Sequence, residues 1–155
     1  MRYSVGFSCT RLTTTAATAY PLATIVPPTT GKVSVAELTF TYPSPAISPM
    51  YLLARPSVAG VNPLQYSTFT SEEDPSAPAA LTRVVTSWAV DPTVPGLTSP
   101  KLRSHSVTAT GYVGMIWSFP RGLALPPTGT GLAFYSITNT VGVVVSADLN
   151  IVINE

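Results

Sequence analysis

The chain has 155 residues and a formal net charge of +1, and only 10% of its residues are charged. This length is typical of one domain that can bury a sizeable core. Ordinary soluble domains have about 25% charged residues, so this surface is either rich in Ser and Thr or covered by copies of the chain or by a partner. The eight Lys and Arg residues are spread singly along the sequence. We therefore expect no nucleic-acid partner, because nucleic-acid binding requires a basic face.

The residue usage predicts an all-β protein. Thr (22 residues) and Val (17 residues) are abundant, whereas Lys and Glu together number six. β-Branched side chains favour an extended backbone. Strand-like stretches follow one another at spacings of roughly ten residues, with Pro and Gly turns between them. The pattern predicts a single antiparallel β-sandwich domain over residues 1–155, jelly-roll-like, with about eight to ten strands.

The N-terminal region divides into a clear strand and an ambiguous segment. A first strand is predicted over residues 2–11, and Cys9 lies on its apolar face as a small buried side chain. Cys9 is the single cysteine, so no intrachain disulfide can form. Residues 12–31 are Thr-rich with an apolar centre. They are either a poorly paired strand plus a loop or an extended arm that lies on a neighbouring subunit.

Targeting signals are weak. Arg11 and a tract of threonines stand where a signal peptide would need an apolar segment. Residues 122–147 lack charge, but Pro and Gly interrupt every apolar run, so no transmembrane helix and no membrane partner are expected. Synthesis in the cytoplasm of the host cell is the simplest expectation.

The stretch from Lys32 to Tyr42 has apolar residues on both faces of its predicted strand. A β-bulge near Glu37 would shift the alternation and bring both sets to the core. A carboxylate in mid-strand suggests catalysis, but a position at a strand edge or a pair with an arginine is more common. Arg55 is the last residue of a short predicted strand, Met50 to Arg55, and either lies at the sheet rim or pairs with Glu37.

The middle of the chain is less regular. Residues 61–70 show little pattern, and residues 71–78 (SEEDPSAP) contain three of the seven acidic residues. Calcium loops alternate their ligands differently, so this segment favours a turn at Asp-Pro over a cation site. Strands are predicted within residues 79–90 and 101–111. The second contains His105, the only histidine, which is expected to be a surface or hydrogen-bonded residue.

The last third of the chain has the clearest pattern. Strands are predicted over residues 111–120, 123–126, 130–138 and 143–154. In the final one, every second residue from Val143 to Ile153 is apolar, as a strand with one buried face requires. Arg121 lies between Pro120 and Gly122, which predicts a tight turn with an exposed arginine at its tip.

Catalytic motifs are missing from the sequence. There is no nucleophile-elbow spacing, and one His with one Cys cannot supply the clustered ligands of a zinc site. The Gly-Thr-Gly at 129–131 lacks the Lys-Ser/Thr of a phosphate loop. We therefore expect a protein that is not an enzyme and has no cofactor.

Several stretches in combination resemble the small structural proteins of tailed phages and prophages. They occur in this order: YSVGF (3–7), KVSVAELTF (32–40), LLARPSVAG (52–60), EEDPSAPAA (72–80), TSWAVDPTVP (86–95) and WSFPRGLALPPTGTGLAFY (117–135). The likeness is to the order of these blocks, and each block alone is weak. The Thr- and Pro-rich segment 12–31 departs from the pattern.

The resemblance implies a capsid decoration, or cement, protein with a jelly-roll-like β-sandwich. Such proteins form homotrimers on the outer surface of the phage head, where major capsid proteins meet, and so the expected partners are further copies of the chain and the major capsid protein. The residues expected to contact partners are Leu12, Tyr20, Ile25, Pro27, Pro28 and Arg121.

One alternative remains open at this point. A phage receptor-binding or carbohydrate-binding jelly-roll module of a tail or head fibre would have the same composition. Such a module needs exposed aromatic side chains in a concave patch. The candidates for that patch are Tyr42, Tyr51, Tyr66 and Trp88.

Overall fold

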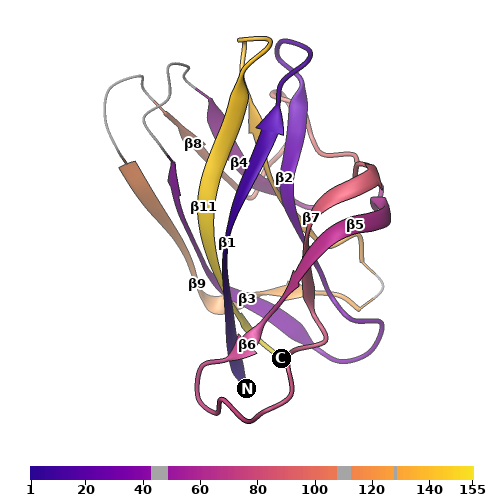
Figure 1. Ribbon diagram of the computed structural model, residues 1–155, viewed down its shortest axis with the longest axis vertical. Coiled ribbons are helices and arrows are strands. Elements are labelled where there is room, and N and C mark those ends of the chain that lie inside the picture. The colour runs from indigo at the N-terminus through magenta and orange to yellow at the C-terminus, as the bar shows by residue number, and fades with distance from the viewer. Residues whose placement is uncertain (43–48, 108–112, 128) are drawn as a thin grey trace.

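The computed structural model describes residues 1–42, 49–107, 113–127 and 129–155, and over these residues it confirms an all-β sandwich of two antiparallel sheets (Figure 1). Eleven strands are present in this described part, against the eight to ten predicted. They are β1 (Arg2–Leu12), β2 (Ala19–Val26), β3 (Val33–Tyr42), β4 (Met50–Ala54), β5 (Val61–Thr68), β6 (Thr70–Ser71), β7 (Arg83–Val90), β8 (Arg103–Ser106), β9 (Val113–Leu125), β10 (Leu132–Ile137) and β11 (Val144–Asn154).

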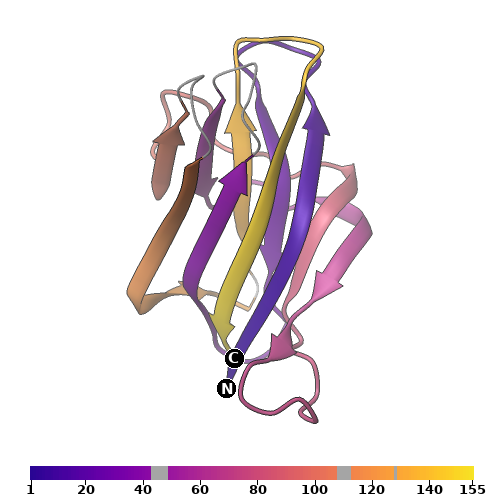
Figure 2. The same ribbon diagram turned by 60° about the vertical axis from the view of Figure 1, so that its left-hand side comes forward.

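The strand order is that of a jelly roll with an insertion. One sheet has the order β6-β1-β11-β3-β9 and the other β5-β7-β2-β10-β4-β8. Without β5, β6 and β7, two four-stranded sheets remain, β1-β11-β3-β9 and β2-β10-β4-β8. This is the double Greek key of a jelly roll, in which the chain alternates between the two layers. The insertion between β4 and β8 widens both sheets at the same side of the sandwich (Figure 2).

The five-stranded sheet is centred on β11. β11 pairs with β1 along its whole length, from Leu12 opposite Val144 to Arg2 opposite Asn154, and with β3 on its other side. Its residues alternate between buried and exposed from Val144 to Leu149, as predicted. β11 therefore brings the start, the middle and the end of the sequence into one sheet.

A β-bulge in β3 confirms the prediction for that strand. Val35 and Glu37 both have a partner on β11 and on β9, whereas Ala36 between them has none. The extra residue shifts the alternation, so that Val35 before the bulge and Leu38 after it both face the core. Glu37 consequently points away from the core, where it accepts a hydrogen bond from the Thr39 hydroxyl at 3.2 Å.

The core between the sheets is centred on aromatic rings. The ring of Phe40 on β3 lies 4.8 Å from that of Trp117 and 5.0 Å from that of Phe134, and Tyr51 stacks on Phe134 at 5.6 Å. These residues come from both sheets. Offset and edge-on ring contacts of this kind add to the free energy gained from burial alone.

The connections of the insertion form a partial third layer. After β4, residues 55–60 leave the sheet, and residues 91–100 return to β8; Val58 and Thr93 pair where the two segments meet. Val94 packs on a small second core on the outer face of the six-stranded sheet, formed by Leu52, Ala54, Ala133, Tyr135 and Ile137. The crossing segments therefore cover a face that would otherwise expose apolar side chains.

Of the two alternatives for residues 12–31, the structure has the strand plus a loop, but the strand is well paired. Residues 19–26 form β2, which is bonded to β7 on one side and β10 on the other. Leu22 and Ile25 are each at most 2% exposed. The central strand was hidden in the sequence because its apolar residues are consecutive, as they are in a strand buried on both faces.

The turn predicted at Arg121 is also corrected. Residues 113–125 form one strand, β9, and both of its halves pair with β3. Residues 119–122 lie opposite the single residue Ala36, so the chain bulges out of the sheet edge without reversing direction. Gly122 has φ of +70°, a conformation that favours glycine. Arg121 is exposed on this bulge.

Replacing Phe40 is expected to destabilise the fold strongly. Phe40 is fully buried, so Phe40→Ala should lower the free energy of unfolding by about 3–5 kcal/mol through lost contacts and a residual cavity. Chemical denaturation followed by tryptophan fluorescence measures this. Ile116→Ala is the matched control, because Ile116 is 59% exposed on β9 and its loss should change stability by about 0.5 kcal/mol or less. Equal effects of the two substitutions would contradict the position of the core.

Candidate functional site

The titratable residues that most often perform catalysis have structural surroundings here. Burial raises the pKa of Cys9 to about 12, and its thiol donates to the Ala147 carbonyl at 3.4 Å, which confirms its prediction as a buried side chain. His105 Nε2 lies 3.4 Å from the Tyr42 hydroxyl. Within the described ranges no three His, Cys, Asp or Glu residues are grouped so as to hold a metal ion. The remaining candidates for a functional site are charged and apolar features of the surface.

The fold gathers five cationic side chains around the edge of the sandwich formed by β8 and β9. We call this surface the basic edge; it comprises Lys32, Arg55, Lys101, Arg103 and Arg121. In the described part of the chain none of the five forms an ion pair with a carboxylate. Apart from Lys101 and Arg103, they lie far from one another in the sequence, so the sequence alone does not predict the basic edge.

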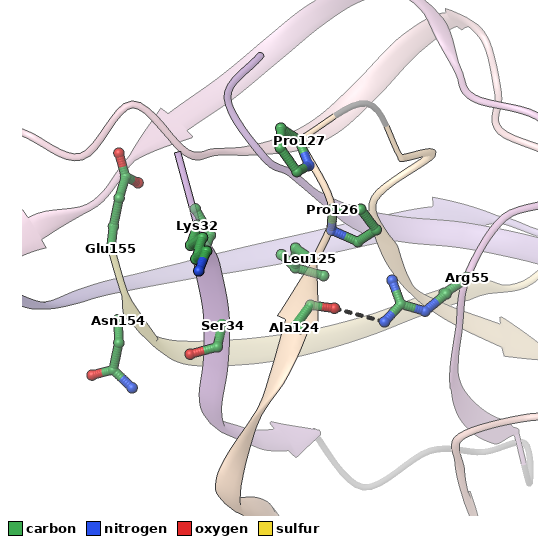
Figure 3. Close-up of a pocket in the computed structure, with 10 residues that line it drawn as sticks. Lys32, Ser34, Arg55, Ala124, Leu125, Pro126, Pro127, Asn154 and Glu155 are labelled. Atoms are coloured by element: carbon green, nitrogen blue, oxygen red, sulfur yellow. Dashed lines mark hydrogen bonds between the residues drawn. The ribbon is translucent and has the colours of Figure 1, made fainter. Parts of the chain in front are cut away.

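The largest hollow on the basic edge is a groove of about 670 Å³ (Figure 3). Its wall is formed by the start of β3, the end of β9 and the segment after β4. Figure 3 shows Lys32 and Arg55 on either side of Leu125 and Pro126. Arg55 Nη2 donates to the Ala124 carbonyl at 2.6 Å. Arg55 therefore lies at the rim of the sheet and joins the end of β4 to β9, and no ion pair with Glu37 is seen.

One carboxylate in the groove is already engaged. Glu155 accepts hydrogen bonds from the Leu81 and Thr82 backbone N–H groups, at 2.9 and 3.0 Å, and from the Thr82 hydroxyl at 2.7 Å. These donors satisfy its oxygens within the chain. The charges of Lys32 and Arg55 therefore remain available to an anionic group in the groove.

Two smaller depressions extend the groove along the same edge. One is lined by Arg55 and Lys101, so it adjoins the groove at Arg55. The other is lined by Arg103, Phe119 and the bulge at Arg121. The Arg103 guanidinium lies 4.9 Å from the centre of the Phe119 ring, a cation–π contact between the two sheet edges. The basic edge thus combines apolar hollows with exposed positive charge.

Three acidic residues, Glu72, Glu73 and Asp74, lie together elsewhere, in the loop between β6 and β7. We call residues 71–82 the acidic loop. Glu72 forms an ion pair with Arg2 at 2.8 Å, and Asp74 accepts hydrogen bonds from the Ser76 N–H and hydroxyl, which lower the pKa of Asp74. The turn predicted at Asp74-Pro75 is therefore present. Glu73 is exposed and has no ion-pair partner among the described residues.

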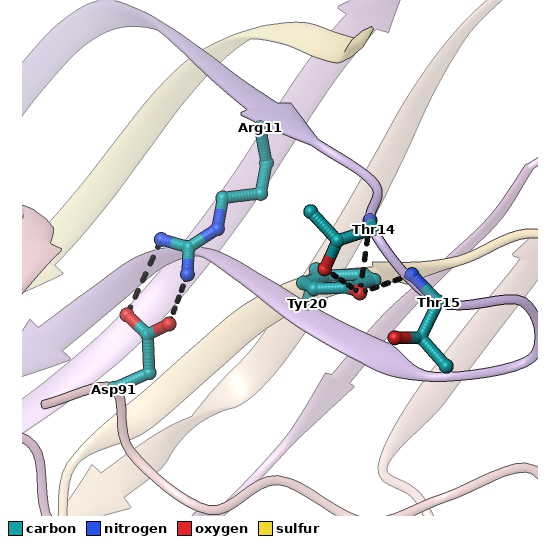
Figure 4. A network of polar contacts seen from close by, with 5 residues as sticks. All are labelled: Arg11, Thr14, Thr15, Tyr20 and Asp91. Carbon is teal, nitrogen blue, oxygen red and sulfur yellow. Dashed lines mark hydrogen bonds and ion pairs between the residues drawn. The ribbon is translucent and has the colours of Figure 1, made fainter. Parts of the chain in front are cut away.

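The opposite end of the molecule has its own polar network (Figure 4). Arg11 at the end of β1 forms a bidentate ion pair with Asp91, just after β7. This pair fixes the return segment of the insertion against the other sheet. The Tyr20 hydroxyl lies 3.0 and 2.7 Å from the Thr14 and Thr15 backbone nitrogens. The Thr14 hydroxyl, together with these N–H groups, lowers the pKa of Tyr20 to about 8.

The six residues expected to contact partners fall into two groups. Ile25 and Pro27 are buried in the folded chain, so their side chains are not free to reach a partner. The other four are at least partly exposed, namely Leu12 at the end of β1, Tyr20, Pro28 and Arg121. Of the six, the basic edge includes only Arg121.

The aromatic residues proposed for a carbohydrate site form no shared patch on the surface. Tyr42 and Tyr51 are core residues, each 1% exposed. Trp88 is half-buried. Tyr66 is exposed on β5, where Arg83 covers its ring at 4.9 Å. These four side chains form no shared concave surface.

Comparison with known proteins identified no family for this chain. No family model, no curated protein and no solved structure matches the chain. No helix that could cross a membrane was found in the described ranges.

The unusual surroundings of Tyr20 predict an early step in the titration of the seven tyrosines. Hydrogen-bond donors favour the phenolate, so Tyr20 should ionise near pH 8, whereas burial raises the pKa of Tyr135 to about 12. Because the folded-state pKa of Tyr20 is below the unfolded value of about 10, the stabilisation it provides should grow between pH 8 and 10 and be lost as the pH falls through 8.

Absorbance at 295 nm during a pH titration measures the step directly. Tyr20→Phe should remove a step equal to one tyrosine near pH 8, while Tyr66→Phe should leave it in place. A wild-type titration without any step below pH 9 would contradict the hydrogen bonds at Tyr20.

Proposed function

We propose that the protein is a non-enzymatic structural component of a phage virion. It acts as a trimeric decoration, or cement, protein that binds the outer surface of the capsid and stabilises contacts between major capsid proteins. The observation that carries the proposal is the separation of charge on a charge-poor surface, with a basic edge beside β8 and β9 and an acidic loop on the insertion. The order of sequence blocks that resembles decoration proteins adds support.

The jelly roll is compatible with this role but does not determine it. Viral capsid proteins, lectins and cupins all use this architecture, so function has to be argued from the surface. Here the surface offers binding features: hollows lined by apolar residues, exposed cations and an acidic loop. Each is typical of a protein that works through contacts with other macromolecules.

The inserted strand β5 adds an apolar contact surface. Seven of its eight residues are exposed, including Val61, Leu64 and Tyr66, and Val90 on the neighbouring β7 is exposed as well. β5 is also the last strand of its sheet. Exposed apolar side chains along an unpaired sheet edge commonly mark a contact surface. This surface therefore supports the proposal that the edge of the sheet is covered by another chain in an assembly.

A cement protein stabilises a shell by mass action. If it binds the assembled capsid and not the separated subunits, each bound copy shifts the equilibrium toward the assembled form. This role needs a rigid body with complementary surfaces and needs no reactive group. The two paired sheets and the internally hydrogen-bonded acidic loop provide the rigidity that this role requires.

The location on the virion can be tested directly. Gold-labelled antibody against this chain is expected to decorate the outside of phage heads prepared from cells that contain its gene, at regular positions seen by electron microscopy. Heads stripped of the protein should lose the label and should rupture at lower temperature. Label confined to tails or to the soluble fraction would contradict the decoration role.

A further inference from the structure

We propose that the acidic loop of one copy docks on the basic edge of the next, so that copies of this chain join head to tail. The contact deepens the self-association that the proposed function requires. It is a property of the isolated chain, however, and can be measured without any capsid. Three features support the contact: the shape of the loop, the chemistry of the groove and the placement of both on the fold.

The acidic loop offers carboxylates together with apolar side chains. Glu73 and Asp74 are exposed, and the prolines at 75 and 78 flank them on the same loop. Leu81 at its end is 66% exposed. The exposed leucine and the two prolines give the loop apolar surface as well as charge. Their combination with carboxylates suits a groove that is apolar inside and cationic at its sides.

The loop is held in one shape by its own hydrogen bonds. Ser71 Oγ accepts from the backbone N–H groups of Glu73 and Asp74 at 3.3 and 3.0 Å, and the Ala77 N–H donates to the Asp74 carbonyl at 3.0 Å. The ion pair of Glu72 with Arg2 ties its start to β1. A loop that is already ordered loses less conformational entropy when it docks, which increases affinity.

The groove is complementary in both shape and charge. Its volume of about 670 Å³ is enough for several side chains, and its floor includes Leu125 and Pro126. Lys32 and Arg55 stand at its sides without carboxylate partners in the described residues. A proline or leucine in the groove would bury apolar surface, while Glu73 or Asp74 would meet a cation at the rim.

The balance of charge favours a second copy over a nucleic acid. The whole chain has eight basic and seven acidic residues, so its charge is separated between two surfaces and is not in excess. Nucleic-acid binders carry a clear excess of basic residues on the binding face and need no apolar groove. A second copy supplies carboxylates for the cations of the basic edge and apolar side chains for its groove.

The placement of the two surfaces determines the kind of assembly. The bend of β9 and the acidic loop lie at different sides of the molecule (Figure 2), whereas the groove reaches the end of the loop, because Glu155 lines the groove and accepts from the Leu81 and Thr82 N–H groups. Because the two surfaces differ, the contact is heterologous, and repetition closes into a ring or continues as a filament. A ring of three copies would satisfy every acidic loop and every basic edge.

Charge reversal on each surface separates the two halves of the contact. The edge variant is Lys32→Glu with Arg121→Glu, two exposed residues whose side chains have no hydrogen-bond partner in the described structure. The loop variant is Glu73→Lys with Asp74→Asn, which keeps an acceptor for Ser76. Sedimentation velocity at low and high salt reads the size of the particles. Circular dichroism confirms that every variant is folded.

The wild-type chain should form oligomers at low salt that dissociate in 1 M salt, because salt screens the charge pairs. Each variant alone should associate about tenfold more weakly or worse. In an equimolar mixture the acidic loop of the edge variant meets the basic edge of the loop variant, and the reversed loop meets the reversed edge, so the mixture should regain association beyond dimers. The chain with all four substitutions should regain assembly.

Val141→Glu is the matched control, since it adds the same new charge to an exposed residue of the loop between β10 and β11 that does not line the basic edge, and should leave assembly unchanged. A monomeric wild-type chain at low salt and millimolar concentration would overturn the proposal, as would full assembly by either variant alone. Binding of a single-stranded oligonucleotide to a monomeric chain through Lys32 and Arg121 would also overturn it and would assign the basic edge to a polyanion. Gold labelling of phage heads is independent of these results, so failure of the docking contact and failure of the decoration role are distinguishable.

Discussion

The pairing of β11 with β1 and β3 is the interaction on which the rest of the structure depends. β11 bonds to β1 through eleven residue pairs and to β3 through seven. Its inward side chains, among them Leu149, Ile151 and Ile153, line the main core. The segments joined in this way are separated by more than a hundred residues, so the sheet forms only when the whole chain is folded. Loss of this pairing would expose the main core and disrupt the surfaces on which binding depends.

The insertion between β4 and β8 gives the jelly roll its particular surface. It adds β5 and β7 to one sheet and β6 to the other, and it contains the acidic loop. Its return segment closes the second core through Val94 and is anchored to β1 by the Arg11–Asp91 pair. The insertion is therefore a fixed part of the fold. The insertion thereby places carboxylates, apolar side chains and a free sheet edge on one side of the sandwich, and its acidic loop ends beside Glu155, at the groove of the basic edge.

Features encoded in local periodicity were predictable from the sequence. The alternation in β11, the bulge beside Glu37 and the buried position of Cys9 all follow from which neighbours are apolar, and all three are confirmed. β2 was predicted only as a poorly paired strand, one of two alternatives, because a strand buried on both faces does not alternate. β5 was missed because its residues are exposed on both faces, so burial leaves no pattern in its sequence.

The basic edge could not be predicted because it depends on long-range pairing. Lys32, Arg55 and Arg121 become neighbours only when β3, β4 and β9 reach their places in the two sheets. The bulge that exposes Arg121 shows the same limit. Pro120 and Gly122 signalled an irregularity correctly, but only the register with β3 shows that the strand continues beyond it. The local sequence thus predicted where the backbone is irregular, but not how the irregularity shapes the surface.

The central claim is that the acidic loop of one copy contacts the basic edge of another. The most direct measurement is zero-length carbodiimide cross-linking of a mixture of ¹⁴N- and ¹⁵N-labelled chains, followed by mass spectrometry of the peptides. The account predicts a bond between the Lys32 amine and the Glu73 carboxylate in peptides that pair one ¹⁴N with one ¹⁵N segment. Cross-links found only between segments with the same label, or none that join Lys32 to the acidic loop, would contradict it.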